Sequence, residues 1–107
     1  MEIFLKTVAA LNDETRVLLL CFLDEHGECC VCDLQESLEM IQSRLSRHLK
    51  ILKDAGFLKV VRKGTWAYYS IRSPLDRFRL EALEEIRYLD INLPTFKSCN
   101  TDKECKV

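Results

Sequence analysis

The chain has 107 residues, which is enough for one small domain and too few for two separate hydrophobic cores. Charged residues make up 31% and hydrophobic residues 48%, with three Gly and two Pro, so the composition is that of a soluble, helix-leaning globular domain and excludes a disordered chain. The formal net charge of −1 hides a partition, because residues 42–69 carry seven basic side chains and one acidic, whereas residues 1–41 carry nine acidic and two basic.

Two helices are predicted before Gly27. Residues 3–11 form the first, because four apolar side chains recur at helical spacing: Ile3, Phe4, Val8 and Leu11. Residues 12–15 supply capping and acidic side chains for a second, leucine-rich helix, which runs to about Glu25 and is ended by Gly27.

Two further helices are predicted before Gly56. The first is short, begins near Cys32 and Asp33 and ends around residues 38–40; Asp33 and Glu36 have the spacing of a capping box. The second spans roughly residues 42–55 and buries a stripe of leucines, with its basic side chains largely outside that stripe: Leu45, Leu49 and Leu52.

A hairpin and a fifth helix complete the predicted fold. Residues 57–62 and 66–71 are β-type runs joined by residues 63–65. Pro74 opens the fifth helix, whose apolar stripe has steps of three and four residues: Leu75, Phe78, Ala82, Ile86 and Leu89. We therefore predict a mainly α fold with a small β-hairpin, in the order α-α-α-α-β-β-α of a winged helix-turn-helix.

The fourth predicted helix carries side chains suited to reading DNA. In a helix-turn-helix the second helix enters the major groove, where Gln can pair with adenine and Arg with guanine. A wing adds mainly sequence-independent contacts to the backbone or minor groove. The candidates are Gln42, Ser43, Arg44, Ser46, Arg47, His48 and Lys50 on the helix, and Arg62, Lys63 and Thr65 on the wing. Alternatively, these basic side chains only form a solvated helix face.

Three segments closely resemble the ArsR/SmtB family of metalloregulatory winged-helix repressors: Ala10–Arg16, Gln42–Leu58 and Arg62–Ile71. The resemblance covers about residues 5–90. It implies a homodimer formed through the first and last helices, which binds double-stranded operator DNA at an imperfect inverted repeat. We therefore assign residues 1–92 to a winged-helix DNA-binding and dimerisation domain, and residues 93–107 to a polar, cysteine-containing tail.

Six cysteines would suggest a disulfide framework in a secreted domain, but the sequence has no recognisable signal peptide, and we expect a cytoplasmic protein. No apolar run reaches the roughly 20 residues of a membrane span, so we expect no membrane partner. In a reducing compartment, clustered cysteines more often bind metals or act in redox chemistry. The cluster of Cys29, Cys30 and Cys32 therefore indicates a soft-ion site, whereas Cys21 fits a buried apolar position.

Residues 30–34, Cys-Val-Cys-Asp-Leu, match the motif that arsenical and cadmium/lead sensors of the ArsR/SmtB family carry at the third helix. The resemblance implies that Cys30 and Cys32 bind arsenite, As(III), or antimonite, Sb(III), as an inducer that releases the repressor from its operator, with no catalytic cofactor. Arsenite repressors with this site have a third cysteine where this chain has Gln35. Because As(III) forms three bonds to sulfur, the third-ligand candidates are Cys29, Cys99 and Cys105.

Other interpretations of the cysteines stay open. The Cys30/Cys32 pair alone would suffice for a mono-substituted organic arsenical, and the same repressor fold could respond to cadmium, to lead or to thiol oxidation. A structural zinc could use four of the cysteines: Cys29, Cys32, Cys99 and Cys105. The last predicted helix has no histidine, which argues against the family's Asp/His/Glu zinc or nickel site.

The spacing of Cys30 and Cys32 has a consequence for mechanism. On a helix these two positions point about 200° apart, so both sulfurs reach one atom only if the backbone departs from helix there. Binding would then deform the start of the third helix and shift the recognition helix. We do not expect an enzyme, because the sequence has no phosphate-cradling glycine loop and no nucleophile–base pairing.

Overall fold

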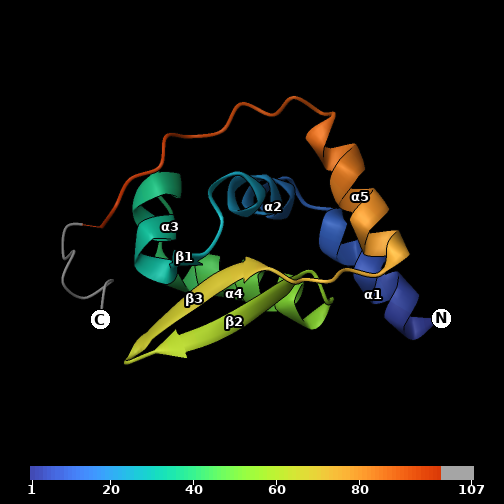
Figure 1. The fold of residues 1–107 in the computed structure, drawn as a ribbon, viewed down its shortest axis with the longest axis horizontal. Helices are drawn as coiled ribbons and strands as arrows, with labels where there is room; N and C mark the ends of the chain where they lie inside the picture. The colour runs from blue at the N-terminus through green and yellow to red at the C-terminus, as the bar shows by residue number, and fades with distance from the viewer. Residues whose placement is uncertain (100–107) are drawn as a thin grey trace.

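The computed structural model describes residues 1–99, which fold as a winged helix-turn-helix (Figure 1). The elements are α1 (Glu2–Leu11), α2 (Glu14–His26), β1 (Cys29–Cys30), α3 (Val31–Leu38), α4 (Gln42–Asp54), β2 (Leu58–Lys63), β3 (Trp66–Ile71) and α5 (Arg77–Arg87). The mainly helical fold class is confirmed, and β1 is an additional strand that the sequence did not predict. Within the described range, no helix is both long and apolar enough to span a membrane.

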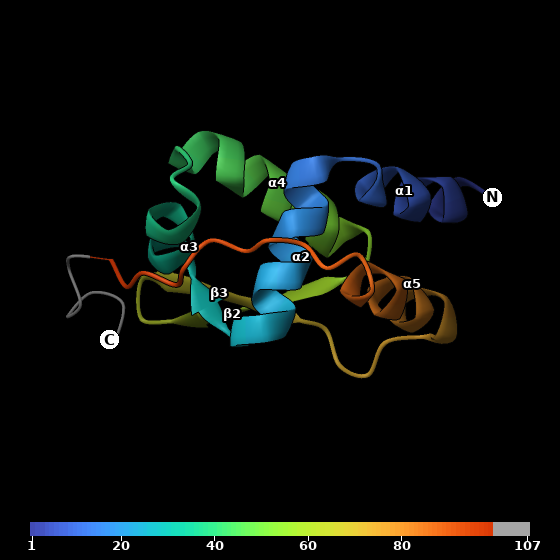
Figure 2. The ribbon, with the colours of Figure 1, turned by 90° about the horizontal axis from the view of Figure 1, so that it is seen from above.

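The hydrophobic core is built around α2, which lies in the middle of the molecule (Figure 2). Its N-terminus is capped as predicted, because the Asp13 carboxylate accepts a hydrogen bond from the Arg16 backbone N–H at 3.2 Å. The predicted leucine stripe of α4 packs into the same core. Each of these buried leucines stabilises the fold by roughly 1.5–3 kcal/mol. The innermost side chains are Leu19, Leu20, Phe22, Leu34, Leu45, Leu49 and Leu52.

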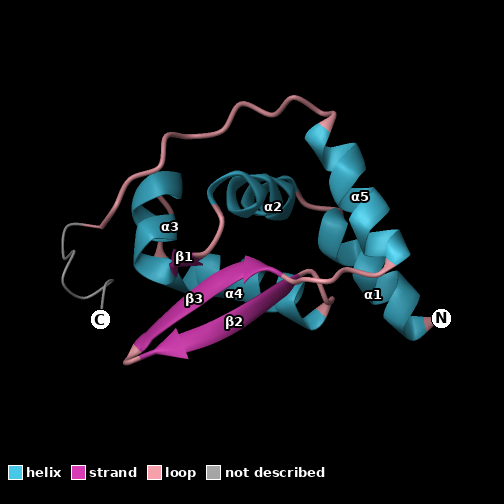
Figure 3. Ribbon diagram, viewed as in Figure 1, coloured by secondary structure: helices cyan, strands magenta, loops and turns pink. Residues whose placement is uncertain are grey.

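The sheet has the order β1-β3-β2 and is antiparallel throughout (Figure 3). β2 and β3 form the predicted hairpin, and β1 pairs with the other edge of β3. Cys29 lies opposite Tyr69, and Cys30 lies opposite Tyr68. The short strand therefore fixes the cysteine segment to the wing at a defined register.

Two predicted helix starts need correction. α3 begins at Val31 and its N-cap is Cys30, whose Sγ accepts a hydrogen bond from the Asp33 backbone N–H at 3.4 Å, so Asp33 lies in the first turn and does not cap the helix. α5 begins at Arg77, not at Pro74, because the backbone is still extended at the N-cap residue Asp76. α5 also ends at Arg87, so the predicted stripe residue Leu89 lies beyond it.

α1 and α5 lie side by side at one end of the molecule in both ribbon views (Figures 1 and 2). The rings of Phe4 on α1 and Phe78 on α5 are 5.5 Å apart between centroids. Both side chains remain about half exposed, at 54% and 41%. An apolar surface therefore crosses this pair of helices.

After α5 the chain returns across α2 to α3 (Figure 2). We call residues 88–99 the C-terminal strap. Ile91 and Leu93 pack against the core, and the Phe96 ring stacks over Phe22 with a centroid distance of 6.3 Å. The described part of the predicted tail, residues 93–99, is thereby held against α2 and α3.

Candidate functional site

The exposed face of α4 carries most of the predicted DNA contacts. Six of the seven helix candidates are exposed: Gln42, Ser43, Arg44, Ser46, Arg47 and Lys50. Lys50 forms an ion pair with Asp54 at 2.9 Å. At the surface such a pair contributes little, so it does not prevent a contact to phosphate.

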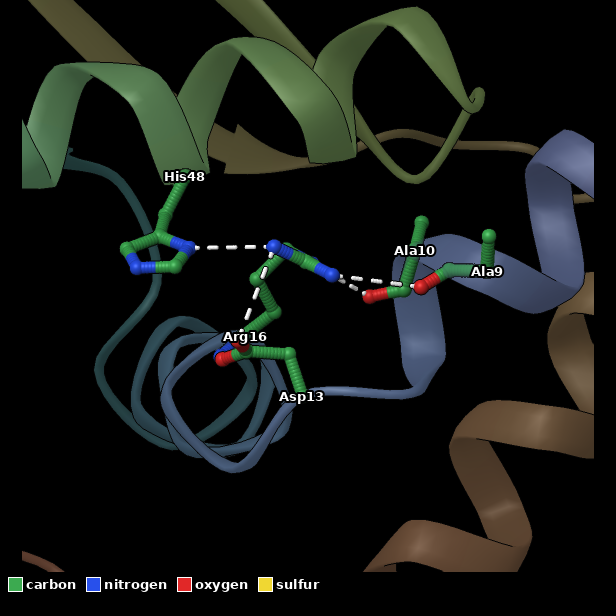
Figure 4. A network of polar contacts seen from close by, with 5 residues as sticks. All are labelled: Ala9, Ala10, Asp13, Arg16 and His48. Atoms are coloured by element: carbon green, nitrogen blue, oxygen red, sulfur yellow. Dashed lines mark hydrogen bonds and ion pairs between the residues drawn. The ribbon is translucent and has the colours of Figure 1, made fainter.

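His48, the remaining helix candidate for a DNA contact, does not lie on that exposed face. Its side chain is 3% exposed and points from α4 toward α2 (Figure 4). Nη1 of Arg16 donates a hydrogen bond to His48 Nδ1 at 3.2 Å, which requires the neutral ring with its proton on Nε2. Burial lowers the pKa of His48, and the nearby charge of Arg16 acts in the same direction.

Arg16 joins three helices through one guanidinium (Figure 4). Nε donates to the Ala10 carbonyl at 2.8 Å, and Nη2 donates to the Ala9 carbonyl at 3.2 Å. These carbonyls lie in the last turn of α1, while Arg16 itself belongs to α2 and its partner His48 belongs to α4. The network fixes the recognition helix relative to α1 and α2. This role of Arg16 was not predicted, although the sequence places this arginine shortly after a cap residue in an acidic segment.

The wing candidates lie at the end of the hairpin. Arg62, Lys63 and Thr65 are all exposed. Nζ of Lys63 forms an ion pair with the Glu28 carboxylate at 2.7 Å, which links the wing to the segment just before β1. The tip of the wing thus contacts the neighbourhood of the cysteines directly.

Cys29 and Cys30 face opposite ways, as neighbours in a strand must. Cys29 belongs to the main hydrophobic core, is 2% exposed, and its thiol donates to the Gly27 carbonyl at 3.4 Å. Burial, with the charge of Asp33 second, raises the pKa of Cys29 to about 12. Cys30 instead lies in a separate small cluster with Cys99, against which Cys32 and Tyr68 pack.

Cys32 and Cys99 are joined by a disulfide, with their Cα atoms 5.6 Å apart across a sequence separation of 67 residues. Three cysteines from two distant segments therefore meet at one place: Cys30, Cys32 and Cys99. The change from strand to helix falls between Cys30 and Cys32, so their side chains reach the same place without any distortion of α3. The deformation of the helix start that the sequence predicted is therefore not needed to bring Cys30 and Cys32 together.

The other cysteines stand apart from this cluster. Cys21 lies in α2, partly buried against the core as predicted, and burial raises its pKa. Cys105 lies outside the described residues. With the disulfide formed, residues 1–99 contain no group of three or more His, Cys, Asp or Glu side chains arranged to hold a metal ion.

A pocket of about 420 Å³ connects the cysteine site to the DNA-facing side chains. Cys32 and Gln35 of α3 line one side of this pocket. Gln42 and Ser46 line it from α4, and Arg62 and Thr65 line it from the wing. A movement of α3 at Cys32 would therefore act on the same surface that carries the DNA candidates.

Known proteins with similar sequences give independent evidence on the family of this chain. Residues 13–60 match the family described as "Bacterial regulatory protein, arsR family". The chain is 48% identical over 62 residues to the arsenical resistance operon repressor of Bacillus subtilis (strain 168), a match that covers 58% of this chain and 59% of that protein.

Two solved structures are similar over most of the described fold. HlyU from Vibrio cholerae N16961 superposes with a TM-score of 0.70 at 25% identity, covering 83% of this chain and 92% of that chain. The AntR antimony-specific transcriptional repressor superposes with a TM-score of 0.64 at 31% identity, covering 78% of this chain and 72% of that chain. The chain spans between 48% and 64% of the length of three curated relatives from arsenic-resistance systems, among them the B. subtilis protein.

Proposed function

Because the chain belongs to the ArsR family of bacterial regulatory proteins, whose matched members are transcriptional regulators and not enzymes, we propose that it is an operator-binding repressor induced by trivalent arsenic or antimony. The inducer binds the thiolates of Cys30, Cys32 and Cys99. The observation that carries this proposal is the meeting of those three cysteines beside the recognition helix.

The donor set fits the proposed inducer. Soft thiolates select thiophilic ions, and arsenite or antimonite, when bound, forms three bonds to sulfur. Cys99 supplies the thiolate that the local motif lacks at Gln35. Cys29 is the weaker candidate, because its side chain faces the main core on the other side of β1. The Cys32–Cys99 disulfide must first be reduced to two thiols by a cellular thiol such as glutathione, two molecules of which are oxidised to one glutathione disulfide.

The chain's own elements can pass the signal to DNA. Cys99 belongs to the strap, Cys32 to the first turn of α3, and Cys30 to β1, which pairs with the wing. A bond network among these three sulfurs fixes strap, α3 and wing relative to one another. Cys32 also lines the pocket that α4 and the wing line, so a shift of α3 at Cys32 reaches the DNA-facing side chains. Release from the operator requires only that the inducer binds more tightly to the arrangement that cannot bind DNA than to the arrangement that can.

In the proposed repressor, α4 and the wing contact the operator DNA. The exposed residues of α4 read bases in the major groove, and the wing contacts the backbone. Two such units are needed for an inverted repeat, and the apolar surface across α1 and α5 is the proposed homodimer contact. His48 is excluded from the contact set, since it is buried against Arg16.

The test uses a duplex selected from a random library by the reduced protein, with binding followed by fluorescence anisotropy. Arsenite and antimonite should release the wild-type protein. Cys30→Ser, Cys32→Ser and Cys99→Ser should each raise the arsenite concentration needed by at least about tenfold, while Cys21→Ser, the matched control, should respond normally. Release of the Cys30→Ser or Cys99→Ser protein at the wild-type arsenite concentration would show that the proposed site is wrong.

Two further titrations separate the alternatives. Methylarsenite needs only two thiolates, so it should still release the Cys99→Ser protein if Cys30 and Cys32 act as a pair. Cadmium that releases the protein at concentrations below those of arsenite would favour the cadmium/lead alternative.

Thiol oxidation is a second candidate function, favoured by the Cys32–Cys99 disulfide itself. Here the same pair would respond to an oxidant, with two thiols giving one disulfide and two electrons passing to the oxidant. Oxidised glutathione, with no metalloid present, should then release the wild-type protein and leave the Cys99→Ser protein on DNA. An unchanged affinity of the oxidised wild-type protein would exclude this mode.

A further inference from the structure

The strap is attached to α3 by hydrogen bonds that do not involve sulfur. The Lys97 backbone N–H donates to Ser37 Oγ at 2.7 Å, and the Ser37 hydroxyl donates to the Lys97 carbonyl at 3.2 Å. Ser37 is 3% exposed, so this reciprocal pair is shielded from water. One hydroxyl thus satisfies both backbone groups of a strap residue two positions before Cys99.

A second attachment lies at the other end of α3. The Cys99 backbone N–H donates to Asp33 Oδ1 at 3.1 Å. The backbone N–H of the same aspartate donates to Cys30 Sγ at 3.4 Å. Asp33 therefore contacts two of the three cysteines of the proposed site, one through its side chain and the other through its backbone.

We propose that Ser37 and Asp33 are positioning residues, which hold the strap on α3 so that Cys99 is presented to Cys32 and Cys30 before any bond to sulfur forms. The inference rests on the proposed function for the use of Cys99 as a ligand. The positioning role predicts a high effective concentration of the Cys99 thiol at Cys32, and this quantity can be measured without metalloid.

Ser37 and Asp33 can raise the effective concentration of the Cys99 thiol because they reduce the conformational entropy of the strap in advance. Cys99 follows α5 by 12 residues, counted from Arg87, and a flexible tether of about that length gives an effective concentration of the order of millimolar. Hydrogen bonds at both ends of α3 remove most of that freedom in advance, and the stacking of Phe96 on Phe22 aligns the strap before them. Preorganisation of this kind raises affinity by lowering the ordering cost of binding.

The test is the equilibrium of the full-length protein with glutathione, followed by thiol trapping and mass spectrometry. Each Cys32–Cys99 disulfide formed reduces one glutathione disulfide to two glutathione thiols, so the equilibrium constant reports the effective concentration. Ser37→Ala should lower this constant by about tenfold, because both backbone groups of Lys97 lose their partner. The matched control Ser73→Ala, at an exposed serine in the loop between β3 and α5, should leave it unchanged.

Two variants of Asp33 separate positioning from charge. Asp33→Asn and Asp33→Ala both remove the negative charge, but only asparagine keeps an oxygen that can accept the Cys99 N–H. The constant should therefore be near the wild-type value for Asp33→Asn and lower for Asp33→Ala. The comparison of the two Asp33 variants also gives a result if circular dichroism shows that Ser37→Ala does not fold.

The outcomes distinguish this inference from the proposed function. Wild-type constants for both Ser37→Ala and Asp33→Ala would overturn the positioning role. Lowered constants in a protein that arsenite does not release from DNA would support the positioning role and refute the proposed inducer. Lowered constants together with a weaker arsenite response in the same two variants would support both.

Discussion

Cys29 and Cys30 are neighbours in β1, yet Cys29 packs into the main hydrophobic core and Cys30 packs against Cys99. Strand alternation gives two adjacent thiols different surroundings. In the proposed site, the thiol on the side of α3 and the strap, that of Cys30, is the one that shares the inducer with Cys32. The two cysteines are therefore expected to differ in every functional measurement.

Cys29→Ala should keep the arsenite response and lose stability, by about 1 kcal/mol, because it removes a buried sulfur from the core. Cys30→Ser should lose the response and remain folded. A serine hydroxyl can replace the thiol as the N-cap acceptor for the Asp33 N–H, and serine is a favoured N-cap residue. Urea unfolding and arsenite titration on DNA measure the two properties separately. A Cys29→Ala protein that no longer responds to arsenite while still binding DNA would contradict this assignment.

His48 should make the stability of the fold depend on pH. Burial lowers its pKa in the folded protein below the ordinary value of 6.5. The charges of Arg16, Arg44 and Arg47 lower this pKa further, and Asp13 partly opposes them. A group with a lowered folded pKa binds more protons when unfolded, so its contribution is complete above pH 6.5 and is lost as the pH falls from there toward the folded pKa.

The measurement is urea unfolding of the reduced protein at about pH 7.5 and about pH 5.5. His48→Asn is the matched variant, because the asparagine oxygen can accept from Arg16 in place of Nδ1 but does not titrate. The wild-type protein should lose more stability than His48→Asn between the two pH values. Equal losses would show that His48 is not the titrating group.

The Arg79 guanidinium joins α5 to α1 and to the end of α4 because it donates hydrogen bonds to three acceptors. Nε donates to the Ala55 carbonyl at 2.8 Å, Nη2 donates to Thr7 Oγ1 at 3.0 Å, and Nη1 donates to Asp76 Oδ1 at 2.8 Å. Gly56 has a φ of +90°, and a Cβ added there would lie 2.7 Å from Arg79 Nε. The glycine is therefore needed both for its backbone conformation and for the approach of this guanidinium.

Arg79→Lys should lower the free energy of unfolding by about 1–3 kcal/mol, because an ammonium cannot reach the three acceptors in the planar arrangement of the guanidinium. Arg77→Lys is the control, since the Arg77 side chain is 90% exposed and pairs with Glu81 on the same helix. Chemical denaturation of the two variants and the wild-type protein measures the difference in the free energy of unfolding. Similar midpoints for the two variants would argue against the linking role of Arg79.

The apolar surface over α1 and α5 predicts a homodimer that charge should disrupt. Phe4→Glu or Phe78→Glu places a carboxylate in the proposed contact and should shift sedimentation from dimer to monomer. Val61→Glu is the control, because Val61 is exposed to a similar degree, 39%, but lies on β2. A wild-type protein that sediments as a monomer at micromolar concentration would remove the basis for the prediction.

Much of the fold could be predicted from local pattern. The leucine stripe of α4, the cap at Asp13 and the hairpin turn are each specified by neighbouring residues, and the structure contains all three. β1 could not be predicted in this way. It has only two residues, and it exists because β3 offers a partner edge that is distant in the sequence.

The site was harder to predict than the fold, for the same reason. The motif at Cys30 and Cys32 was visible, but which of the described candidates Cys29 and Cys99 lies near that motif depends on strand alternation and on the path of the strap. His48 matched the family signature by position, yet its side chain lies against Arg16, because residue 48 shares the inner side of α4 with Leu45, Leu49 and Leu52. Sequence position alone does not distinguish the edge of a buried stripe from an exposed face.

The last prediction concerns how α4 contacts DNA. Arg47→Ala should weaken binding to the selected duplex, and if Arg47 contacts a phosphate the slope of log affinity against log salt should fall by about 1. Gln42→Ala should instead leave the salt slope unchanged and reduce discrimination between the selected duplex and a random one, since a base contact carries sequence information. Arg77→Ala on α5, outside the proposed contact surface, should change neither quantity. If Arg47→Ala binds with wild-type affinity at every salt concentration, the exposed side of α4 is only a solvated basic face.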